Sequence, residues 1–501
     1  MIDSVFNQVV RLDESKNYNE MLSFVKTSRL GAEQRLALFW KVFSAQRLAA
    51  CYVVAVAIIE AGADGPAIRM VEFIGSLMFS NGVRCPPALE QLRRQLPTDS
   101  SALEELRRTL EPLVAFTTLN LFKADRLDAV LTIRDAWTLL SPGIASAFGE
   151  SPPHQETTTR LLSFPTPPPA RSPRRAVVAI RKYLYTNRAG SRLHDFGPRL
   201  VTAMQAYGWL PDFHPMQTVG SGQELDAEYR KITELCRSRN AEVLVIDEFI
   251  ANTHTTNCAN EIIALKKDMP NLKVIVLYLD TWSLEQNDVI RAIEIVDYVW
   301  NMFPALSLYR NSGMAEKVFE GPYPMGGMSG SLTTPLTGHI RFVGGIQLYN
   351  WHRAFWIAAA QSDRLRIEAQ ISSVVDDGLS ALDSYRDYFQ RLEKTGCCLN
   401  FSMRLNESRI LTGRAFEAIL AGALLVQEET ADMPYYFKAG EHYLSFATYA
   451  ELREIARFIA EEPAEAEAIR RRGFDFACAR YADDKAIGYL DGLLFNPPPA
   501  R

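Results

Sequence analysis

The sequence lacks the features of a disulfide-bonded, zinc-binding or membrane-spanning protein. Its seven cysteines are scattered and form no CxxC pair, and its seven histidines are equally dispersed, so neither a disulfide framework nor a structural metal site is indicated. The most apolar stretch, residues 48–59, is too short to span a bilayer and is expected to form a buried helix. No basic segment followed by an apolar run opens the chain, so no signal peptide is indicated and a cytoplasmic location is expected.

A strong excess of charge is also missing. The 54 lysines and arginines nearly balance the 59 aspartates and glutamates, and the net charge of -5 provides no basic field for nucleic acid. A hydrophobic content of 48% excludes a disordered or fibrous protein. With 501 residues, the chain is long enough for about three domains, each with its own core.

The chain divides by pattern into a helical part, a linker and an α/β part. Residues 1–150 show helical spacing and few strand signals, which predicts an all-α domain; loosely similar helix pairs leave a degenerate helical repeat open. Residues 151–173 are rich in proline, which blocks helix and strand hydrogen bonding, and are interpreted as a linker.

After the linker, short β-rich runs alternate with amphipathic helical stretches, which is typical of parallel sheets flanked by helices. Two such units are predicted, residues 174–336 and 337–501. The strands expected in them are residues 176–181, 242–249, 273–279 and 298–302, then 340–343, 366–371, 396–401 and 423–427. The predicted fold is therefore α/β, with two Rossmann-like domains preceded by an all-α domain and a ligand bound in the cleft between the two α/β units.

One segment, residues 411–429, combines an apolar helix face with a polar one. Thr412 is predicted to cap a helix whose core face carries Phe416, Ile419 and Leu420. A fully apolar strand is expected to follow, as in a buried parallel sheet.

The polar face of this helix carries Arg414 and Glu417 beside small alanines, so a ligand is expected to approach closely. The free N–H groups of the first turn, starting at Gly413, and the forked guanidinium of Arg414 suit a phosphate. Glu417 would then accept hydrogen bonds from a ribose. The alternative is a solvated Arg414–Glu417 ion pair on an ordinary surface helix.

At these residues the sequence resembles the group 1 glycosyltransferases of the GT-B fold, especially the spore-maturation-type (CgeB-like) branch. The resemblance covers about a hundred residues, from residues 399–403 through GRAFEAILAGALLV and residues 435–446 to the arginine-rich helix around Arg470. It implies two Rossmann-like domains in the GT-B arrangement, with the nucleotide bound by the second.

The resemblance also implies that Arg414 contacts the diphosphate and that Glu417 contacts the ribose. Many relatives carry two glutamates eight residues apart, whereas here Arg409 occupies the place of the first. This difference leaves the donor-sugar contact and the stereochemical outcome open.

Further binding candidates follow the predicted strands of the second unit. Gly344 and Gly345 allow a tight turn and a close approach to phosphate, and Arg353 lies early in the next helix. Asn400 and Ser402, at the end of the third strand, could contact the base or a phosphate. An ordinary turn and ordinary polar strand ends are the alternatives.

Catalytic candidates come from the first unit. Asp280 follows an apolar strand beside Trp282 and is the first candidate for a general base or a sugar-hydroxyl contact; the resemblance also places an aspartate there, and a helix N-cap is the alternative. His254 lies in a neighbouring loop that could reach the acceptor. His194, at the end of the basic stretch 171–194, is expected to meet donor phosphates or an anionic acceptor, the alternative being a basic linker and a solvated loop.

The leading hypothesis is a glycosyltransferase that moves a hexosyl group from a nucleotide sugar to a protein, a lipid-linked glycan or a polysaccharide. No cofactor and no metal are expected, because no DxD-like pair lies at a convincing strand end. The helical domain would hold the acceptor or form homo-oligomers, and peripheral membrane contact is left open. A sugar-nucleotide epimerase and a catalytically inactive GT-B scaffold or binding protein are the alternatives.

Overall fold

The computed structural model describes most of the chain. It leaves out residues 1, 46, 63, 80–84, 150–160, 162–172, 182, 188–189, 194, 217–221, 248–255, 279–295, 302–316, 321–322, 347–349, 372–379, 404–408 and 496–501. The chain forms two compact units, which we call the helical unit (Met1–Ser151 with Ile346–Leu365) and the α/β unit (Pro152–Gly345 with Arg366–Arg501). The predicted linker, residues 151–173, lies mostly outside the described residues.

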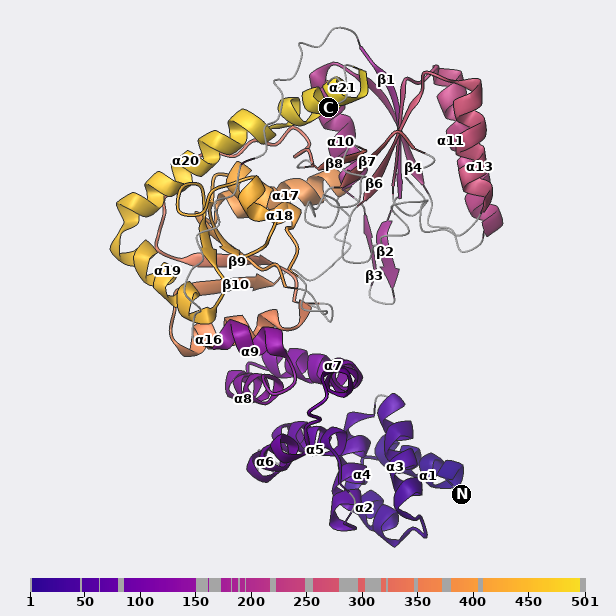
Figure 1. Cartoon of the computed structure of the whole chain (residues 1–501), viewed down its shortest axis with the longest axis vertical. Coiled ribbons are helices and arrows are strands. Elements are labelled where there is room, and N and C mark those ends of the chain that lie inside the picture. Colours follow the sequence, from indigo (N-terminus) through magenta and orange to yellow (C-terminus); the bar gives the residue numbers. More distant parts are fainter. Residues whose placement is uncertain are drawn as a thin grey trace. The chain divides into compact units, whose positions relative to one another are not determined.

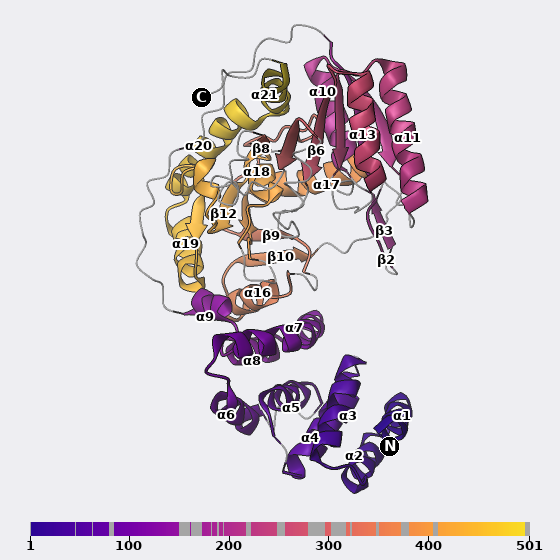
Figure 2. The same cartoon turned by 45° about the vertical axis from the view of Figure 1, so that its right-hand side comes forward.

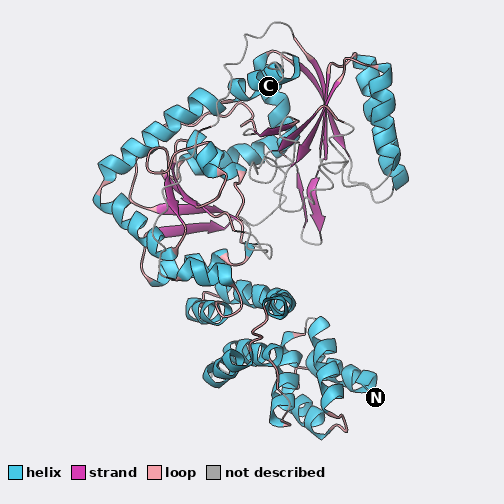
Figure 3. Ribbon diagram, in the orientation of Figure 1, coloured by secondary structure: helices cyan, strands magenta, loops and turns pink. Residues whose placement is uncertain are grey.

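The described part of the helical unit contains helices and no strand (Figure 3). Its helices are α1 (Ile2–Glu14), α2 (Tyr18–Thr27), α3 (Ala32–Ser44), α4 (Leu48–Glu60), α5 (Pro66–Phe79), α6 (Cys85–Gln95), α7 (Ser100–Lys123), α8 (Leu127–Trp137), α9 (Pro142–Phe148) and α16 (Arg353–Ser362). Local signals set several boundaries: the Asp99 side chain caps α7, and Ser141 caps α9 with Pro142 in its first turn.

Helix α16 joins the helical unit from a distant part of the sequence. It packs against α8 and α7. Two aromatic pairs hold it there: Trp351 meets Trp137 edge-on at 5.8 Å between ring centroids, and Trp356 meets Phe148 at 5.0 Å. The boundaries expected from the sequence place this helix in the C-terminal α/β domain instead.

The first sheet of the α/β unit has six parallel strands. Their order is β4 (Leu210–Met216), β1 (Arg175–Arg181), β5 (Val243–Asp247), β6 (Lys273–Tyr278), β7 (Tyr298–Asn301) and β8 (Val318–Glu320). Helices α11 (Gly222–Arg239) and α13 (Thr256–Asp268) cover one face, and α10 (Phe196–Tyr207) and α21 (Asp483–Phe495) cover the other (Figure 1). An antiparallel hairpin of β2 (Tyr183–Asn187) and β3 (Gly190–Leu193) accompanies this sheet.

The second sheet has five parallel strands in the order β10 (Ile367–Ile371), β9 (Ile340–Gly344), β11 (Cys397–Asn400), β12 (Leu424–Glu428) and β13 (Leu444–Phe446). One face packs on α17 (Ala381–Glu393), α18 (Gly413–Leu420) and α20 (Pro463–Tyr481). Helix α20 also contacts β12 (Figure 2), and α19 (Tyr449–Glu461) contacts β13. A short 3-10 turn, η3 (Met433–Tyr435), lies between β12 and β13.

The predicted fold is confirmed: an all-helical region precedes two Rossmann-like parallel sheets. All eight predicted strands are present, with ends that differ by at most two residues. Strands β4, β8 and β13 and the β2–β3 hairpin were not predicted from the sequence. Strand β4 contains Pro211 and Pro215, which cannot donate to a ladder, and it lies at the edge of its sheet, where prolines are tolerated.

Among the described helices, none is both long enough and apolar enough to cross a bilayer.

Candidate functional site

The strand order of the second sheet identifies where a ligand would bind. Strand β9 lies between β10 and β11, so the chain first crosses from β9 to β10 in one direction and then from β10 past β9 to β11 in the other. In open α/β sheets, ligands bind at such a switch point, outside the carboxyl ends of the strands. Those ends are Gly344 on β9 and Asn400 on β11, so two predicted binding residues from separate segments meet at this edge.

Helix α18 begins close to the same edge. Thr412 occupies its N-cap position, as predicted, but its side chain caps no backbone N–H; its Oγ1 instead accepts a hydrogen bond of 3.1 Å from Nδ2 of Asn400. The prediction that the hydroxyl caps the helix is therefore wrong. Gly413 and Arg414 are half-buried, and the first turn of α18 presents its N–H groups at the positive end of the helix dipole.

The Arg414 side chain lies along the end of β9. Its Nε donates to the Tyr388 hydroxyl at 3.2 Å, and its guanidinium lies 5.6 Å from the centroid of the Phe342 ring. A Cβ added to Gly344 would lie 2.7 Å from Nη2 of Arg414. Glycine at position 344 therefore makes room for the guanidinium.

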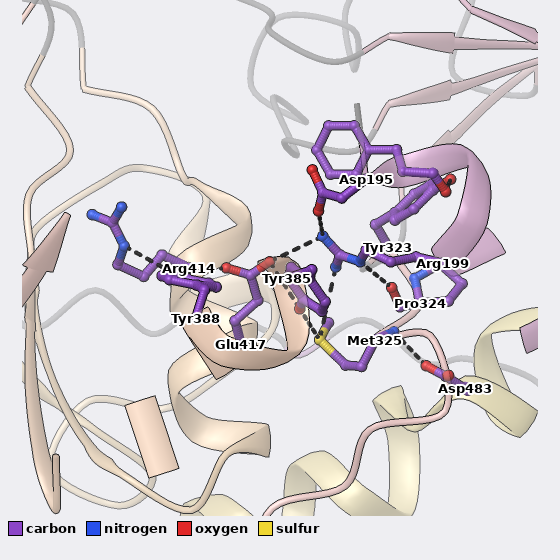
Figure 4. A network of polar contacts seen from close by, with 11 residues as sticks. Asp195, Arg199, Tyr323, Pro324, Met325, Tyr385, Tyr388, Arg414, Glu417 and Asp483 are labelled. Carbon is purple, nitrogen blue, oxygen red and sulfur yellow. Dashed lines mark hydrogen bonds and ion pairs between the residues drawn. The ribbon is translucent and has the colours of Figure 1, made fainter. Parts of the chain in front are cut away.

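The electrostatic setting keeps Arg414 charged. Burial opposes its charge, but the neighbouring Tyr388 and Glu417 side chains outweigh that effect and raise its pKa. Burial likewise raises the pKa of Tyr388, so its hydroxyl keeps its proton. The guanidinium is directed away from Glu417 (Figure 4).

Glu417 is buried and held by protein groups. Its Oε1 lies 3.3 Å from Nη1 of Arg199 and accepts a hydrogen bond of 3.2 Å from the Tyr385 hydroxyl. Its Oε2 accepts a hydrogen bond of 3.0 Å from the Tyr388 hydroxyl. The expected alternative, a solvated Arg414–Glu417 pair, is wrong, because Tyr388 bridges the two side chains and Glu417 is only 8% exposed. Its contact with a ribose stays a prediction.

The small alanines of α18 face the interior. Phe416, Ile419 and Leu420 belong to the core under the second sheet, as predicted. Ala418 and Ala421 are fully buried in the same core. The expectation of an open polar face beside these alanines is therefore wrong, since the helix is enclosed beyond its first turn.

Arg199 contacts Glu417 but was not singled out from the sequence. It lies on α10 and is only 1% exposed. Its partners include Asp195, whose Oδ2 lies 3.1 Å from Nη1, and the carbonyl oxygen of Pro324, which accepts from Nε at 2.9 Å. Burial opposes the charge, but Tyr385, Glu417 and Asp195 outweigh it and raise the pKa of Arg199. An arginine on an otherwise apolar helix face was the only signal available.

Asn400 and Ser402 take part in a fully buried polar network between the ends of β11 and β12. Nδ2 of Asn400 donates to Oε1 of Gln427 at 2.8 Å, and Nε2 of Gln427 donates to Oγ of Ser402 at 2.6 Å. Oε2 of Glu428 accepts from the backbone N–H groups of Ser402 and Met403. This network fixes the two strand ends; the predicted contacts of Asn400 and Ser402 with a base or phosphate stay predictions.

Arg409, the residue at the place of the expected first glutamate, has an acidic neighbour. Its backbone pairs with Met403 in an antiparallel bridge, and its Nε lies 3.8 Å from Oε1 of the buried Glu428. The positive charge at position 409 is therefore set against a negative charge on β12.

Of the remaining predicted residues, Gly345 directly follows β9 in the α/β unit. Arg353 opens α16 and belongs to the helical unit. Asp280, His254 and His194 lie outside the described residues. Within the part of the chain that is described, no cluster of three or more His, Cys, Asp or Glu side chains could hold a metal ion.

Comparison with known proteins gives one family match and several structural likenesses. The family described as glycosyl transferase-like matches residues 349–486. One similar structure is Anabaena HepE in complex with UDP and glucose, which is 11% identical; the match covers 62% of this chain and 97% of that chain at a TM-score of 0.42. Another is a sucrose-phosphate synthase from Thermosynechococcus elongatus, which is 12% identical; the match covers 65% of this chain and 100% of that chain at a TM-score of 0.44. The match to a mutant O-GlcNAc transferase from Thermobaculum terrenum, which is 12% identical, covers 98% of this chain and 96% of that chain at a TM-score of 0.34. No curated protein matches the sequence.

The matched residues include β11, α17, α18, β12 and α20, the elements that carry Tyr388, Arg414 and Glu417. Over residues 349–486, the chain therefore has the sequence pattern of the glycosyl transferase-like family.

Proposed function

We propose that the protein is a glycosyltransferase that moves a hexosyl group from a nucleotide sugar to an acceptor hydroxyl without a metal. One observation carries the proposal: the charged guanidinium of Arg414 lies beside Gly344 at the switch point of the second sheet, next to the N-terminus of α18. This site falls at the edge of the elements that match the glycosyl transferase-like family.

The chemistry required is displacement of a nucleoside diphosphate from the anomeric carbon. As the bond from that carbon to the phosphate oxygen breaks, negative charge grows on the diphosphate. The forked donors of Arg414 and the N–H groups of Gly413 and Arg414 would stabilise this charge, taking the part that a metal ion plays elsewhere. The acceptor oxygen bonds to the anomeric carbon and loses its proton to a base, for which Asp280 is the proposed residue and His254 and His194 are the other candidates.

The acceptor in this proposal is a protein, a lipid-linked glycan or a polysaccharide end. The helical unit would hold that acceptor or join copies of the chain. The scattered cysteines favour action in the cytoplasm.

A second candidate function is a nucleotide-binding scaffold without turnover. The observation that favours it is Arg409, whose charge is set against Glu428 where many relatives carry a glutamate. Release of free nucleoside diphosphate from a panel of nucleotide sugars and acceptors separates the two: the transferase releases it, whereas the scaffold binds the donor without releasing it.

Replacement of Arg414 tests the proposed site. Arg414→Ala removes charge-assisted hydrogen bonds to the diphosphate and is expected to weaken UDP or GDP binding about ten- to a hundredfold. Isothermal titration calorimetry measures the affinity. The matched control is Arg386→Ala, since Arg386 is a half-exposed arginine on α17 that pairs with Asp383. Equal affinity of the wild type and the Arg414 variant for every nucleoside diphosphate would remove Arg414 from the site.

A further inference from the structure

Arg199 gathers groups from four separate segments of the α/β unit. Asp195 precedes α10, Pro324 and Met325 belong to the connection after β8, Tyr385 lies on α17 and Glu417 lies on α18. All of them converge on one guanidinium (Figure 4). The first sheet, which α10 covers, is thereby linked to the helices that cover the second.

The position of this guanidinium is fixed on all sides. Two carboxylates, of Asp195 and Glu417, lie 3.1 and 3.3 Å from its Nη1. Nε donates to the Pro324 carbonyl at 2.9 Å, and the Tyr385 ring centroid lies 3.7 Å from Cζ, within cation–π range. Movement of the guanidinium would leave the buried carboxylate of Glu417 without its counter-charge, which is costly in a protein interior. Arg199 therefore fixes the Glu417 carboxylate.

A single hydroxyl connects Glu417 to Arg414. The Tyr388 hydroxyl donates its proton to Oε2 of Glu417 at 3.0 Å and accepts from Nε of Arg414 at 3.2 Å. A phenol has only one proton to donate, so the bond to Glu417 turns a lone pair of the oxygen toward Arg414. This leaves the outer nitrogens of Arg414 directed away from the network (Figure 4).

We propose that Arg199 is a positioning residue for the nucleotide site: acting through Glu417 and Tyr388, it holds the Arg414 guanidinium in the orientation that binds a diphosphate. The inference rests on the proposed function, in which Arg414 contacts the diphosphate. We call the contacts that lead from Arg199 through Glu417 and Tyr388 to Arg414 the relay.

The first test is Tyr388→Phe with UDP and GDP as probes. Phenylalanine keeps the ring but removes the hydroxyl that orients Arg414, so the affinity is expected to fall about tenfold. Tyr481→Phe is the matched control, because it removes a buried hydroxyl that donates to the Tyr436 carbonyl in the same core; its affinity is expected to equal that of the wild type. Equal affinity of Tyr388→Phe and the wild type would overturn the relay.

The second test asks whether distant residues act as one unit. Arg199→Lys keeps the charge but loses the forked geometry that reaches Glu417 and Pro324 together. The variant with both Arg199→Lys and Tyr388→Phe is expected to bind UDP no more weakly than the weaker single variant, because either change breaks the same relay. Losses that multiply would show independent effects and overturn the proposal.

The outcomes separate this inference from the proposed function. A wild-type protein that binds no nucleoside diphosphate overturns both. If Arg414→Ala weakens UDP binding while Tyr388→Phe does not, the proposed site is supported and the positioning role falls. If Arg199→Lys does not fold, a double-mutant cycle of Tyr388→Phe and Arg414→Lys replaces it as the test. Losses of UDP affinity that are coupled in this cycle support the relay, and independent losses overturn it.

Discussion

At the scale of single residues, the sequence showed which side chains lie at the strand ends but not what holds them. Gly344 and Asn400 were found because apolar runs mark buried strands, and Arg414 was found because it lies on the polar face of a predicted helix. Arg199 and Tyr388 were missed, although they are direct partners of the site. The face of α10 or α17 that meets α18 is set by tertiary packing, which no local pattern encodes.

Asp483 gives a prediction about pH at this scale. Its carboxylate accepts from the backbone N–H groups of Met325 and Gly327, and burial raises its pKa although these bonds oppose the shift. Because the folded pKa lies above the unfolded one, the folded state binds the proton more tightly. The contribution of this group to stability therefore falls as pH rises from the ordinary aspartate pKa through the raised value.

Asp483→Asn removes this titration. The unfolding free energy of the wild type minus that of the variant is expected to decrease as pH rises from about 4, and to level off above the raised pKa. Urea unfolding of both proteins across this range measures the difference. A difference that grows with pH would contradict the raised pKa.

At the scale of elements, α18 is fixed at both ends. At its N-terminus, the Asn400 side chain donates a hydrogen bond to Thr412, the residue that directly precedes the helix. After its last turn, Gly422 adopts a φ of +81°, and a Cβ there would lie 2.3 Å from the Ser331 carbonyl oxygen. The end of the helix at Gly422 was predictable from the residue type. The contact with Ser331 was not, because it comes from a connection about ninety residues earlier in the sequence.

The end of β9 provides a test of this arrangement. In Gly344→Ala, the new Cβ must displace the guanidinium of Arg414, which is the far end of a flexible side chain, so the fold is expected to persist. UDP or GDP affinity is expected to fall about tenfold, since the displaced guanidinium no longer meets the diphosphate. Calorimetric titration and a thermal unfolding curve measure the two effects separately.

The control is Gly31→Ala, where an added Cβ meets no atom within 4 Å and lies in the helical unit. Its nucleotide affinity is expected to match the wild type. Undiminished binding by Gly344→Ala would show that the position of Arg414 beside β9 does not matter for the ligand.

At the scale of the whole molecule, the chain order does not follow the compact units. Helix α16 comes directly after the segment containing Gly344 and Gly345, yet it packs in the helical unit. The sequence could not show this, because residues 353–360 are buried throughout and give α16 no polar face from which its partners could be inferred. The two units are thus connected both through residues 151–152 and at the two ends of the α16 segment.

This arrangement predicts that the helical unit cannot be removed as a separate module. A chain that begins at residue 152 would leave α16 without α7 and α8, and Trp351 without Trp137. We expect it to aggregate, or to unfold at a lower temperature than the full chain. In the full chain, Trp137→Ala is expected to cost about 3–5 kcal/mol of stability, because it removes a buried indole from the contact with α16. Phe116→Ala is the matched control, since that aromatic side chain on α7 is 52% exposed, and little change is expected. A truncated chain that unfolds as cooperatively as the full protein, and at the same temperature, would show that α16 needs no partner from the first 151 residues.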